Sequence, residues 1–388
     1  MRALVAFDKF KDSLTAPEAC AVAVEALQTA EPGWQVTTCP LTDGGDGFAA
    51  ILTQAAGGKI HAATVTGPRG AAVSAQFGLV ALNAIPAAAR ELLALPATIP
   101  DKATVGLIEM ATASGLALLK SDERDPWQTT SRGTGELIAY AAKLGAQVIL
   151  LGVGGSATND LGLGALGALG LRFIGGNHDE VATPVPATWS TITRIEGRVD
   201  APVIRIACDV ANPLLGPQGC STIYGPQKGL AAADLPRMEN LAAQLALQLC
   251  EHAAKSVDLM RAPGAGAAGG IAFGLMTAAN AQLLPGADFV AAWLDLETKL
   301  AAADLVITGE GRFDESSLSG KGPGALALRA LAANKPVHVF AGQIAPPAEP
   351  TSNLHLHAIT PRDLPLPEAL HQAARLLKNA VATTFTHR

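Results

Sequence analysis

The sequence predicts an α/β protein with two domains, and three observations support this prediction. The chain has 388 residues, whereas a single hydrophobic core stops growing at roughly 250–300 residues. Both ends of the chain alternate apolar runs with helical patterns, which is the order of a doubly wound parallel sheet. The middle instead opens with a strand, turn and strand pattern, which predicts a hairpin and therefore a mixed sheet.

The N-terminal segment shows the β-α-β order most clearly. We expect a strand over residues 1–7, a helix from Thr15 to about residue 30, and a second strand over residues 35–41. Thr15 followed three residues later by Glu18 is a capping-box pattern that predicts where this helix begins. Both strands end in acidic loops, and ligands of doubly wound folds bind beyond such strand ends.

The middle segment begins with a hairpin over residues 60–66 and 72–80, joined by Gly67-Pro68-Arg69-Gly70. Residues 83–100 are rich in Ala, Leu and Pro and indicate a helical insertion. Residues 262–284 carry no charge but contain glycines and a proline, so we expect a buried helix rather than a membrane span.

The C-terminal third returns to the pattern of the first 58 residues. Strands are expected over residues 304–308, 336–341 and 354–359, and helices over about 324–333 and 367–382. We therefore predict one discontinuous domain with a Rossmann- or flavodoxin-like parallel sheet, made of residues 1–58 and 285–388. Residues 59–284 would form an inserted α/β domain with a mixed sheet.

Composition and charge exclude several classes of protein. Hydrophobic residues make up 49% and charged residues 16% of the chain, as expected of a compact globular protein. The net charge of −6 and the absence of a Lys/Arg cluster argue against nucleic-acid binding. Five widely spaced cysteines without a C-x-x-C motif argue against disulfides and structural zinc, and we expect a cytoplasmic protein.

The stretch from Leu150 to Asp160, with the sequence L-L-G-V-G-G-S-A-T-N-D, is the first candidate site. A strand over residues 148–151 precedes three glycines, and a Gly/Ala/Leu-rich segment over residues 161–171 predicts a helix. Strand, glycine turn and helix start together can hold a phosphate through backbone N–H groups. The alternative is a tight crossover without a ligand. For a bare glycine turn, this alternative has a prior probability of about one half.

Acidic residues recur in or beside Gly-rich turns at predicted strand ends. They are Asp8, Asp43, Asp46, Asp209, Glu310 and Asp314. One such residue is usually a turn former, but six with the same placement indicate a Mg²⁺ and polyphosphate site, because Mg²⁺ prefers carboxylate, water and phosphate oxygens. Lys11, Lys228 and Lys321 are candidates to neutralise phosphoryl charge, the alternative for each being a solvated surface lysine.

Two other patterns indicate structure rather than function. Residues 264–269 match G-x-G-x-x-G, but Pro263 stands where a hydrophobic strand should end, which argues against a dinucleotide site. The eight histidines show no metal-binding spacing. His355 and His357 lie on one face of a predicted strand, and we interpret them as structural.

Nine sequence blocks in order resemble the bacterial class I glycerate kinases. They are F-D-K-F-K-D-S-L-T-A near Asp8, P-L-T-D-G-G-D-G near Asp43, I-E-M-A-T-A-S-G-L from Ile108, T-T-S-R-G-T-G-E-L-I from Thr129, G-G-S-A-T-N-D from Gly154, C-D-V-A-N-P-L from Cys208, G-P-Q-K-G from Gly225, P-G-A-G-A-A-G-G from Pro263 and I-T-G-E-G-R-F-D from Ile307. The resemblance implies ATP-dependent phosphorylation of D-glycerate, typically to 2-phosphoglycerate. It also implies two α/β domains with the active site between them.

Some positions depart from the family's pattern. Asp46 replaces a Glu, Phe48 a Thr and Ser316 a Gln, while Leu161 and Leu163 replace small residues. Phe48 and Ser316 bear on the substrate pocket, whereas the acidic residues needed for phosphoryl transfer are retained.

A phosphoryl transferase needs metal ligands, cations and a base near the attacking hydroxyl group, and we assign the candidates accordingly. The expected roles are catalysis for Asp209, Lys11 and Lys321; substrate binding for Asp8, Asp43, Asp46, Thr130, Ser131 and Asn159; ATP binding for Gly154, Gly155, Ser156 and Lys228; and Mg²⁺ binding for Glu310 and Asp314. The expected partners are D-glycerate and ATP, without nucleic acid or membrane. Two alternatives remain open: a kinase for another small hydroxy acid, and a non-catalytic sensor of nucleotides or sugar acids.

Overall fold

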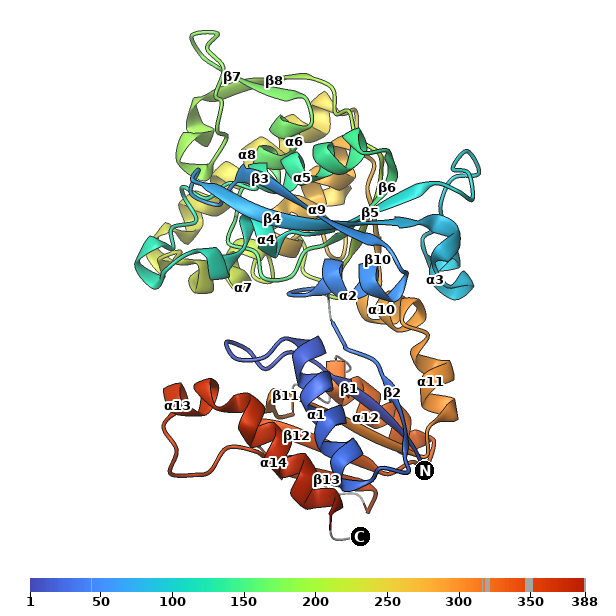
Figure 1. Ribbon diagram of the computed structural model, residues 1–388. Coiled ribbons are helices and arrows are strands. Elements are labelled where there is room, and N and C mark those ends of the chain that lie inside the picture. Colours follow the sequence, from blue (N-terminus) through green and yellow to red (C-terminus); the bar gives the residue numbers. More distant parts are fainter. Residues whose placement is uncertain (43, 316, 318–321, 346–351, 387–388) are drawn as a thin grey trace. The chain divides into compact units, whose positions relative to one another are not determined.

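The computed structural model describes residues 1–42, 44–315, 317, 322–345 and 352–386. The chain divides into two compact units, one formed by Met1–Asp43 with Val290–Arg388 and the other by Gly44–Phe289. Each unit contains one main β-sheet with helices packed against it (Figure 1). No helix within the described ranges is long and apolar enough to cross a membrane.

The main sheet of the first unit combines strands from both ends of the chain. Its order is β13-β12-β11-β1-β2, and its pairings are parallel. The strands are β1 (Arg2–Phe7), β2 (Gln35–Thr38), β11 (Leu305–Phe313), β12 (Val337–Ile344) and β13 (Leu354–Ala358). This arrangement confirms the predicted parallel sheet built from both chain ends.

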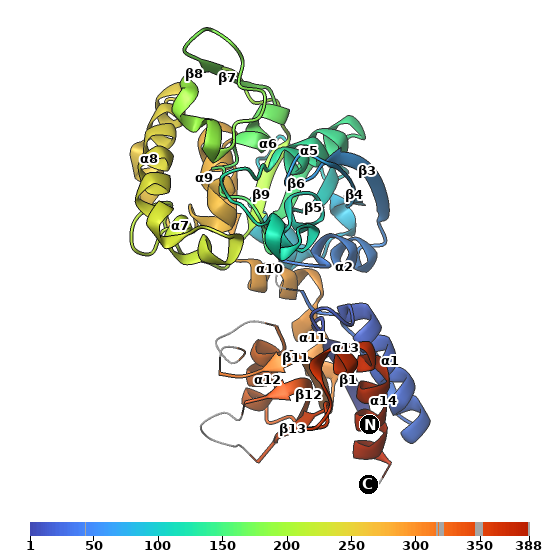
Figure 2. The ribbon, with the colours of Figure 1, turned by 90° about the vertical axis from the view of Figure 1, so that its left-hand side faces the viewer.

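Helices cover both faces of this sheet. Figure 2 shows α1 (Ala16–Ala30) and α14 (Ala373–Phe385) on one side and α12 (Gly322–Ala332) on the other. The predicted capping box is present, because Thr15 N donates to Glu18 Oε2 at 2.8 Å and Glu18 N donates to Thr15 Oγ1 at 3.4 Å. The predicted C-terminal helix is divided at Gln372 into α13 (Leu366–His371) and α14, and α11 (Leu296–Ala302) precedes β11.

Three histidines stack along one face of this sheet. His338 lies opposite His355 in the pairing of β12 with β13. The ring of His338 lies 4.5 Å from that of His355, and the ring of His357 lies 4.5 Å from that of Phe340. A hydrogen bond of 3.0 Å joins His338 Nδ1 and His357 Nε2. Phe385 of α14 covers His338 at 4.9 Å, so the histidines form part of the packing between sheet and helix.

The stability of this unit should depend on the charge of His357. Burial, followed by the charge of His355, lowers the pKa of His357 to about 4 from its ordinary value of 6.5. The unfolded chain therefore binds more protons than the folded chain between these values, so the contribution of neutral His357 is present above pH 6.5 and is lost as pH falls through 4. Allowing for the partial exposure of this side chain, we expect it to account for on the order of 1–2 kcal/mol.

His357→Gln, which does not titrate, should lose less stability than the wild type between pH 7 and pH 4.5. Urea unfolding at both pH values measures the difference, and the exposed His371→Gln serves as the control. Equal acid sensitivity in the His357 variant and the wild type would contradict the prediction.

The main sheet of the second unit is mixed, as predicted. Its order is β10-β9-β6-β5-β4-β3; β3 and β4 form the predicted antiparallel hairpin, β4 is antiparallel to β5, and the remaining pairs are parallel. The strands are β3 (Lys59–Thr66), β4 (Ala72–Ala81), β5 (Thr104–Glu109), β6 (Ala146–Gly152), β9 (Val203–Ala207) and β10 (Gln282–Leu284). A separate hairpin, β7 (Leu171–Gly175) with β8 (Ile192–Gly197), is absent from the sequence-based expectations.

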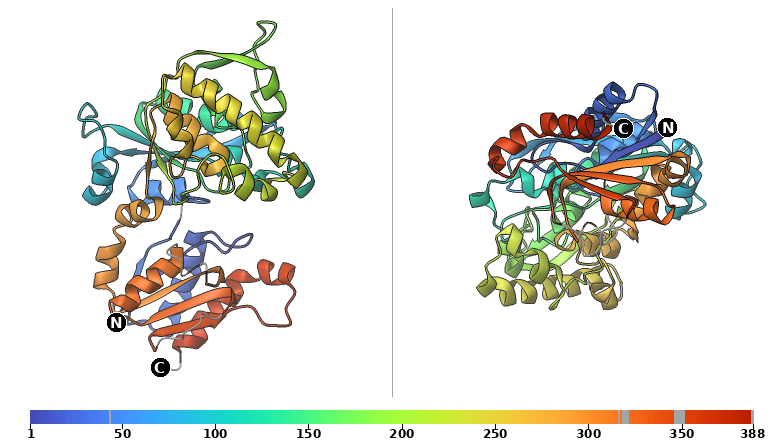
Figure 3. Two further views of the ribbon diagram at one scale, coloured as in Figure 1. Left: turned by 180° about the vertical axis from the view of Figure 1, so that it is seen from behind. Right: turned by 90° about the horizontal axis from the view of Figure 1, so that it is seen from below.

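The helices of this unit lie on both faces of the mixed sheet. Figure 1 shows α5 on one face and α2 on the other, and Figure 3 shows the long α8 beside α9. The helices are α2 (Phe48–Ala55), α3 (Ala87–Leu92), α4 (Ala111–Ser114), α5 (Arg132–Lys143), α6 (Leu163–Ala168), α7 (Cys220–Tyr224), α8 (Leu235–His252), α9 (Ala267–Ala278) and α10 (Gly286–Trp293), which contains the boundary between the units.

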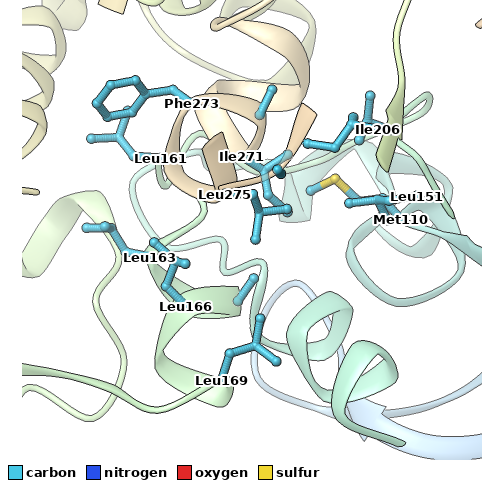
Figure 4. Close-up of a cluster of buried hydrophobic side chains, with 14 of the residues drawn as sticks. Met110, Leu151, Leu161, Leu163, Leu166, Leu169, Ile206, Ile271, Phe273 and Leu275 are labelled. Carbon is cyan, nitrogen blue, oxygen red and sulfur yellow. The ribbon is translucent and has the colours of Figure 1, made fainter. Parts of the chain in front are cut away.

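The hydrophobic core of the second unit forms where α6 and α9 meet the sheet. Ile271 and Phe273 of α9 are fully buried, as are Leu163 of α6 and Leu151 of β6. Figure 4 shows these side chains together with Leu161. Leu161 and Leu163, which depart from the family's pattern, are therefore core residues.

The insertion over residues 83–100 is anchored by a buried arginine. Its helical part is short, with α3 covering only Ala87–Leu92. Arg205 of β9, 3% exposed, donates to the carbonyl oxygens of Leu93 at 2.6 Å and Ala94 at 2.7 Å. Since these carbonyls follow the last turn of α3, Arg205 satisfies acceptors that the helix leaves unpaired.

Residues 44–58 and 285–289 lie in a different unit from the one expected. The sequence places them with the chain ends, but the structure groups them with residues 59–284. The physical reason at the N-terminal boundary is that α2 packs on β4 and β5 of the mixed sheet and buries Phe48 and Leu52. That each unit is a domain able to fold separately stays a prediction.

Candidate functional site

Three parallel strands of the second unit end side by side. Glu109 of β5 lies opposite Gly152 of β6, and Gly152 lies opposite Ala207 of β9. The residues that follow these strands therefore share the carboxyl edge of the sheet, where α/β proteins bind ligands. This edge brings together the glycine turn after β6 and the Asp209 loop after β9.

The two predicted glycine turns pack directly on each other. Gly154 N donates to the carbonyl oxygen of Gly44 at 3.1 Å. A Cβ atom at Gly154 would lie 2.6 Å from Gly45 Cα, so only glycine permits this approach. Gly155 has a φ of +70°, and a Cβ there would lie 3.4 Å from Asp46 Oδ1. Asp46, Gly154, Gly155 and Ser156 thus belong to one cluster.

Phe48 is part of the core beneath these turns. Its side chain is fully buried, and a Cβ at Gly152 would lie 2.7 Å from its ring. The residue that departs from the family's pattern here therefore packs under the turns.

The predicted helix directly after the glycine turn is wrong. The chain is irregular from Val153 to Leu161, and α6 covers only Leu163–Ala168. The N–H groups of its first turn are already bonded: Gly164 N donates to Asp160 Oδ2 at 3.2 Å and Ala165 N to Ser131 Oγ at 3.0 Å. The protein's own acceptors satisfy this helix start, which removes it as a phosphate site.

Asp160 connects the glycine turn to the hydroxyl-rich loop before α5. Its Oδ2 atom accepts hydrogen bonds from Ser131 N at 2.7 Å and Ser131 Oγ at 2.8 Å, and its Oδ1 atom from Gly162 N at 3.1 Å. Thr130 Oγ1 accepts from Arg132 N at 3.2 Å. Burial raises the pKa of Asp160, and its hydrogen bonds to Ser131, Gly162 and Gly164 oppose this shift.

Lys228 is buried beside the same turn. Its ammonium group donates to Ser156 Oγ at 3.0 Å and to the carbonyl oxygen of Thr158 at 2.7 Å, and the side chain is 2% exposed. Burial lowers the pKa of Lys228 to about 8 from 10.5. From the sequence, we expect Lys228 to contact either phosphate or solvent. Its bond to Thr158 was not predicted, because nothing local links residues 70 positions apart.

Several buried polar atoms at this edge have no hydrogen-bond partner among the described residues: Thr158 Oγ1, Asn159 Oδ1 and Asp209 Oδ2. Asn159 Nδ2 donates to Ser221 Oγ at 3.0 Å, which fixes the direction of the amide. Buried polar atoms are normally paired, so unsatisfied ones on the loops after two neighbouring strands indicate a ligand site.

Asp209 is held by the start of α10. Its Oδ1 atom accepts from Ala287 N at 3.1 Å, and a Cβ at Gly286 would lie 3.0 Å from Oδ2. The residue follows β9 at the position expected from the sequence. Its carboxylate is therefore fixed at the carboxyl edge, with one oxygen that has no partner among the residues described.

The first unit brings a second group of predicted residues together. Lys9 N donates to Asp8 Oδ1 at 2.7 Å, and a Cβ at Gly322, the first residue of α12, would lie 3.3 Å from Asp8 Oδ2. Lys11 is exposed, and its backbone N lies 3.3 Å from the Cβ position of Gly311. Asp8 and Lys11 thus lie beside β11 and the start of α12.

Glu310 belongs to β11, and Asp314 directly follows it, whereas a Gly-rich loop was expected there. The strand continues because Gly309 and Gly342 permit close backbone approach: a Cβ at Gly309 would collide with the Phe340 carbonyl oxygen, and one at Gly342 would lie 2.5 Å from that of Gly311. Asp314 pairs with Arg312 at 3.0 Å. Two residues four positions apart on an extended strand are roughly 13 Å apart, so they are poorly placed to share one ion.

Several expected features fall outside this description or outside the cluster. Asp43, Lys321 and Ser316 lie outside the described residues. Within the described ranges, no group of three or more His, Cys, Asp or Glu residues could hold a metal ion.

All five cysteines are free thiols. A cavity of about 420 Å³ lies between the β3–β4 hairpin and α5, and none of the predicted site residues lines it.

Sequence reasoning missed two side chains of this cluster. Asp160 stands in the glycine block, but its role depends on Ser131, 29 positions earlier. Ser221, the partner of Asn159, lies 62 positions later without a motif of its own. Asp160 could have been found from the sequence, because it is an acidic residue directly after Asn159. No local signal marks Ser221.

Comparisons with known proteins identify the relatives of this chain. The family model described as "Glycerate kinase family" matches residues 3–387. The "Glycerate 2-kinase" of Escherichia coli K12 is 37% identical over 92% of this chain and 89% of that protein. The "Glycerate kinase" of Bacillus subtilis 168 is 36% identical over 97% of this chain and 95% of that protein.

A solved structure shows the same fold. It is named "Crystal structure of putative glycerate kinase 2 from Salmonella typhimurium LT2" and covers 99% of this chain and 97% of its own, with a TM-score of 0.78 and 34% identity. The fold and these matches define a kinase. The chain belongs to the glycerate kinase family.

Proposed function

We propose that this protein transfers a phosphoryl group from ATP to D-glycerate, in a Mg²⁺-dependent reaction in the cytoplasm that gives 2-phosphoglycerate. The names of the relatives support the substrate, and one of them is a "Glycerate 2-kinase". The observation that carries the proposal is the set of buried atoms without partners at Thr158, Asn159 and Asp209. D-Glycerate has two hydroxyl groups, which can donate hydrogen bonds to such atoms.

Substrate orientation is assigned to polar residues of the loops. Asn159, Thr130 and Ser131 are proposed to orient glycerate, since Ser221 holds Asn159 and Asp160 holds Ser131 in fixed directions. Asp46 and Asp8 are proposed to bind its hydroxyl groups. Asp43 keeps the same proposed role, although it lies outside the described residues.

The nucleotide contact is assigned to the turn after β6. Because Gly154 N is bonded to Gly44, Gly154 serves mainly to bring the backbone close, and Gly155 with Ser156 would meet the phosphates of ATP. Lys228 lies behind this turn and acts on it through Ser156. Its buried positive charge still favours a polyphosphate nearby, since charge interactions are weakly screened in the interior.

The residues present fit a Mg²⁺ ion held by few protein ligands. Mg²⁺ usually keeps several waters and binds one or two carboxylates together with substrate phosphates. Glu310 and Asp314 supply oxygen donors of the right kind, and their separation along the chain suits one direct ligand rather than two. When bound, the ion would neutralise negative charge on the phosphates.

Catalysis is assigned to positioning and electrostatics. Asp209 is proposed to accept the proton of the attacking hydroxyl group, because one of its oxygens is fixed and the other has no partner within the described ranges. Lys11 and Lys321 are proposed to stabilise the charge of the transferred group.

A coupled assay of ADP release tests the proposal. We expect turnover that requires both D-glycerate and Mg²⁺ and that is much lower with L-glycerate, tartronate and glycerol. The exposed Asp258→Asn is the matched control and should retain full activity. No turnover with any hydroxy acid would remove the kinase assignment for this chain and favour a sensor, whereas preference for tartronate would favour a kinase for another acid.

The position of the phosphate group is read from the product by ³¹P NMR. A phosphate ester on C2 couples to one proton and gives a doublet, whereas an ester on C3 couples to two and gives a triplet. A triplet would identify the product as 3-phosphoglycerate and would contradict the proposed 2-phosphoglycerate.

A further inference from the structure

The turn after β6 ends in a buried anion and contacts a buried cation. Asp160, fully buried, accepts hydrogen bonds from Ser131 N, Ser131 Oγ, Gly162 N and Gly164 N. Lys228, also buried, donates to Ser156 Oγ and to the carbonyl oxygen of Thr158. The segment that carries Thr158 and Asn159 is thus held at both ends by ionisable groups.

These groups connect three parts of the chain that are distant in sequence. Asp160 links the turn to Ser131, at the start of α5, and to the start of α6. Lys228 links it to the segment between α7 and α8. Thr129 adds a further bond, from its Oγ1 atom to the carbonyl oxygen of Ala157 at 3.2 Å. Neither ionisable group is exposed, so each acts through the residues it holds.

We propose that Asp160 is a positioning residue, whose carboxylate holds the Thr129–Ser131 loop on the Ser156–Asp160 turn while the Lys228 ammonium group balances its charge. The inference rests on the proposed function, because it assigns Asn159 and Ser131 to substrate. It adds that their placement depends on a separated pair of buried charges. An unbalanced buried charge is costly, and the charge of Asp160 favours the ionised form of Lys228.

The charges around Lys228 define how this pair responds to pH. Cys220 of α7 and Asp160 both raise the pKa of Lys228 against the dominant effect of burial, which lowers it to about 8. Burial raises the pKa of Cys220 to about 11, whereas the charge of Lys228 and a hydrogen bond with Ser221 oppose this shift and Glu239 of α8 adds to it. Of these groups, Asp160 is the one that also holds substrate-binding residues. Removing its charge should lower the pKa of Lys228 further.

Asp160→Asn should therefore change two separate properties. We expect kcat to fall by about 10²-fold, because a small displacement of orienting residues has this effect. We also expect the alkaline limb of the kcat profile, near pH 8 in the wild type through Lys228, to move to lower pH by on the order of half a unit. A residue that merely stabilised the fold would lower the melting temperature without moving this limb.

Two further variants separate the hydrogen bonds from the charge. Ser131→Ala removes the hydroxyl group that bonds Asp160 and Ala165 but keeps both charges, so kcat should fall while the alkaline limb stays in place. Lys228→Met should abolish the limb near pH 8. A limb that persists in Lys228→Met, or that moves equally in Ser131→Ala and Asp160→Asn, would overturn the inference.

Unfolding measurements test the charge pair without any substrate. The pKa of Lys228 is lower in the folded chain than its ordinary 10.5, so the unfolded chain binds more protons between about pH 8 and 10.5, and Lys228 makes the free energy of unfolding rise with pH there. Relative to Lys228→Met, this rise should begin at lower pH in Asp160→Asn than in the wild type. An unchanged onset would overturn the charge pair, whereas a wild type without glycerate turnover but with the shifted onset would overturn only the proposed function.

Discussion

Asp209→Asn is expected to lower kcat by roughly 10²- to 10⁴-fold, the range that a general base contributes. The structure supports a role at one oxygen only. Asp209 Oδ1 accepts from Ala287 N at 3.1 Å, and Oδ2 is buried without a partner in the part of the chain that the structure describes. The carbonyl oxygen of an asparagine can still accept from Ala287 N, so the loop should keep its conformation. The variant would then lose basicity while nucleotide affinity and melting temperature stay close to wild type.

Asp314→Asn is the informative comparison for this prediction. Asp314 pairs with Arg312 and is assigned to metal rather than to proton transfer. Its replacement should raise the Mg²⁺ concentration needed for half-maximal rate, and excess metal should restore part of the activity. Measuring kcat, apparent Mg²⁺ affinity and melting temperature on both variants distinguishes the two roles. Near-wild-type turnover in both variants would contradict the site assignment. A lower melting temperature without a loss of activity would show that these carboxylates only form turns.

The elements that were predicted well have local signals. The start of α1 follows from Thr15 and Glu18, whose side chain and backbone atoms bond each other within one turn. β9 has the predicted bounds, Val203–Ala207, because it is an apolar run in a parallel sheet. The β3–β4 hairpin follows from a turn between two runs that alternate apolar and polar residues. Its register extends from Lys59 opposite Leu79 to Thr66 opposite Ala72.

The elements that were predicted poorly depend on distant partners. The Gly/Ala/Leu composition after Asp160 suits a long helix, but α6 ends at Ala168 and Leu171 begins β7, which pairs with β8 more than twenty residues later. Glycines in β11 indicated a loop, whereas they permit close approach to β12. In both cases the deciding neighbour comes from another part of the chain, which local propensity does not contain.

The candidate site shows the same division. Strand ends and glycine turns identified Asp209, Gly154 and Asn159 from the sequence, since these features are local. The burial of Lys228 against Ser156 and the bond from Asn159 to Ser221 follow only from tertiary packing. The sequence thus indicated the loops of the candidate site, while packing determines which of their polar atoms lack a hydrogen-bond partner among the described residues.

The P-G-A-G-A-A-G-G block, set aside as a dinucleotide motif, explains how one of these loops is held. Gly269, with a φ of +71°, lies against the turn after β6: its carbonyl oxygen accepts from Leu161 N at 3.0 Å. A Cβ atom at Gly269 would collide with the Thr158 carbonyl oxygen and lie 2.7 Å from Asn159 Cα. Both neighbours are backbone atoms, which cannot move aside as a flexible side chain can.

Gly269→Ala should therefore be among the most damaging single methyl additions in this chain. We expect a loss of roughly 2–5 kcal/mol of stability, from backbone strain together with overpacking, and about a 10²-fold loss of kcat, since Thr158 and Asn159 must shift. Gly145→Ala is the matched control, because Gly145 also has a positive φ, +94°, but a Cβ there would meet no atom within 4 Å. The control variant therefore has the backbone strain of an alanine at positive φ, but its added Cβ atom makes no close contact.

Urea unfolding and steady-state kinetics on both variants measure the two effects. If positive φ alone made Gly269 necessary, both variants would lose similar stability and both would keep their kcat. If contact with the turn matters, only Gly269→Ala loses activity, and it does so even at low temperature, where most of the variant is folded. The second outcome is expected because the backbone at Gly269 directly touches Thr158 and Asn159, of which Asn159 is assigned to substrate, whereas Gly145 lies in the connection between α5 and β6.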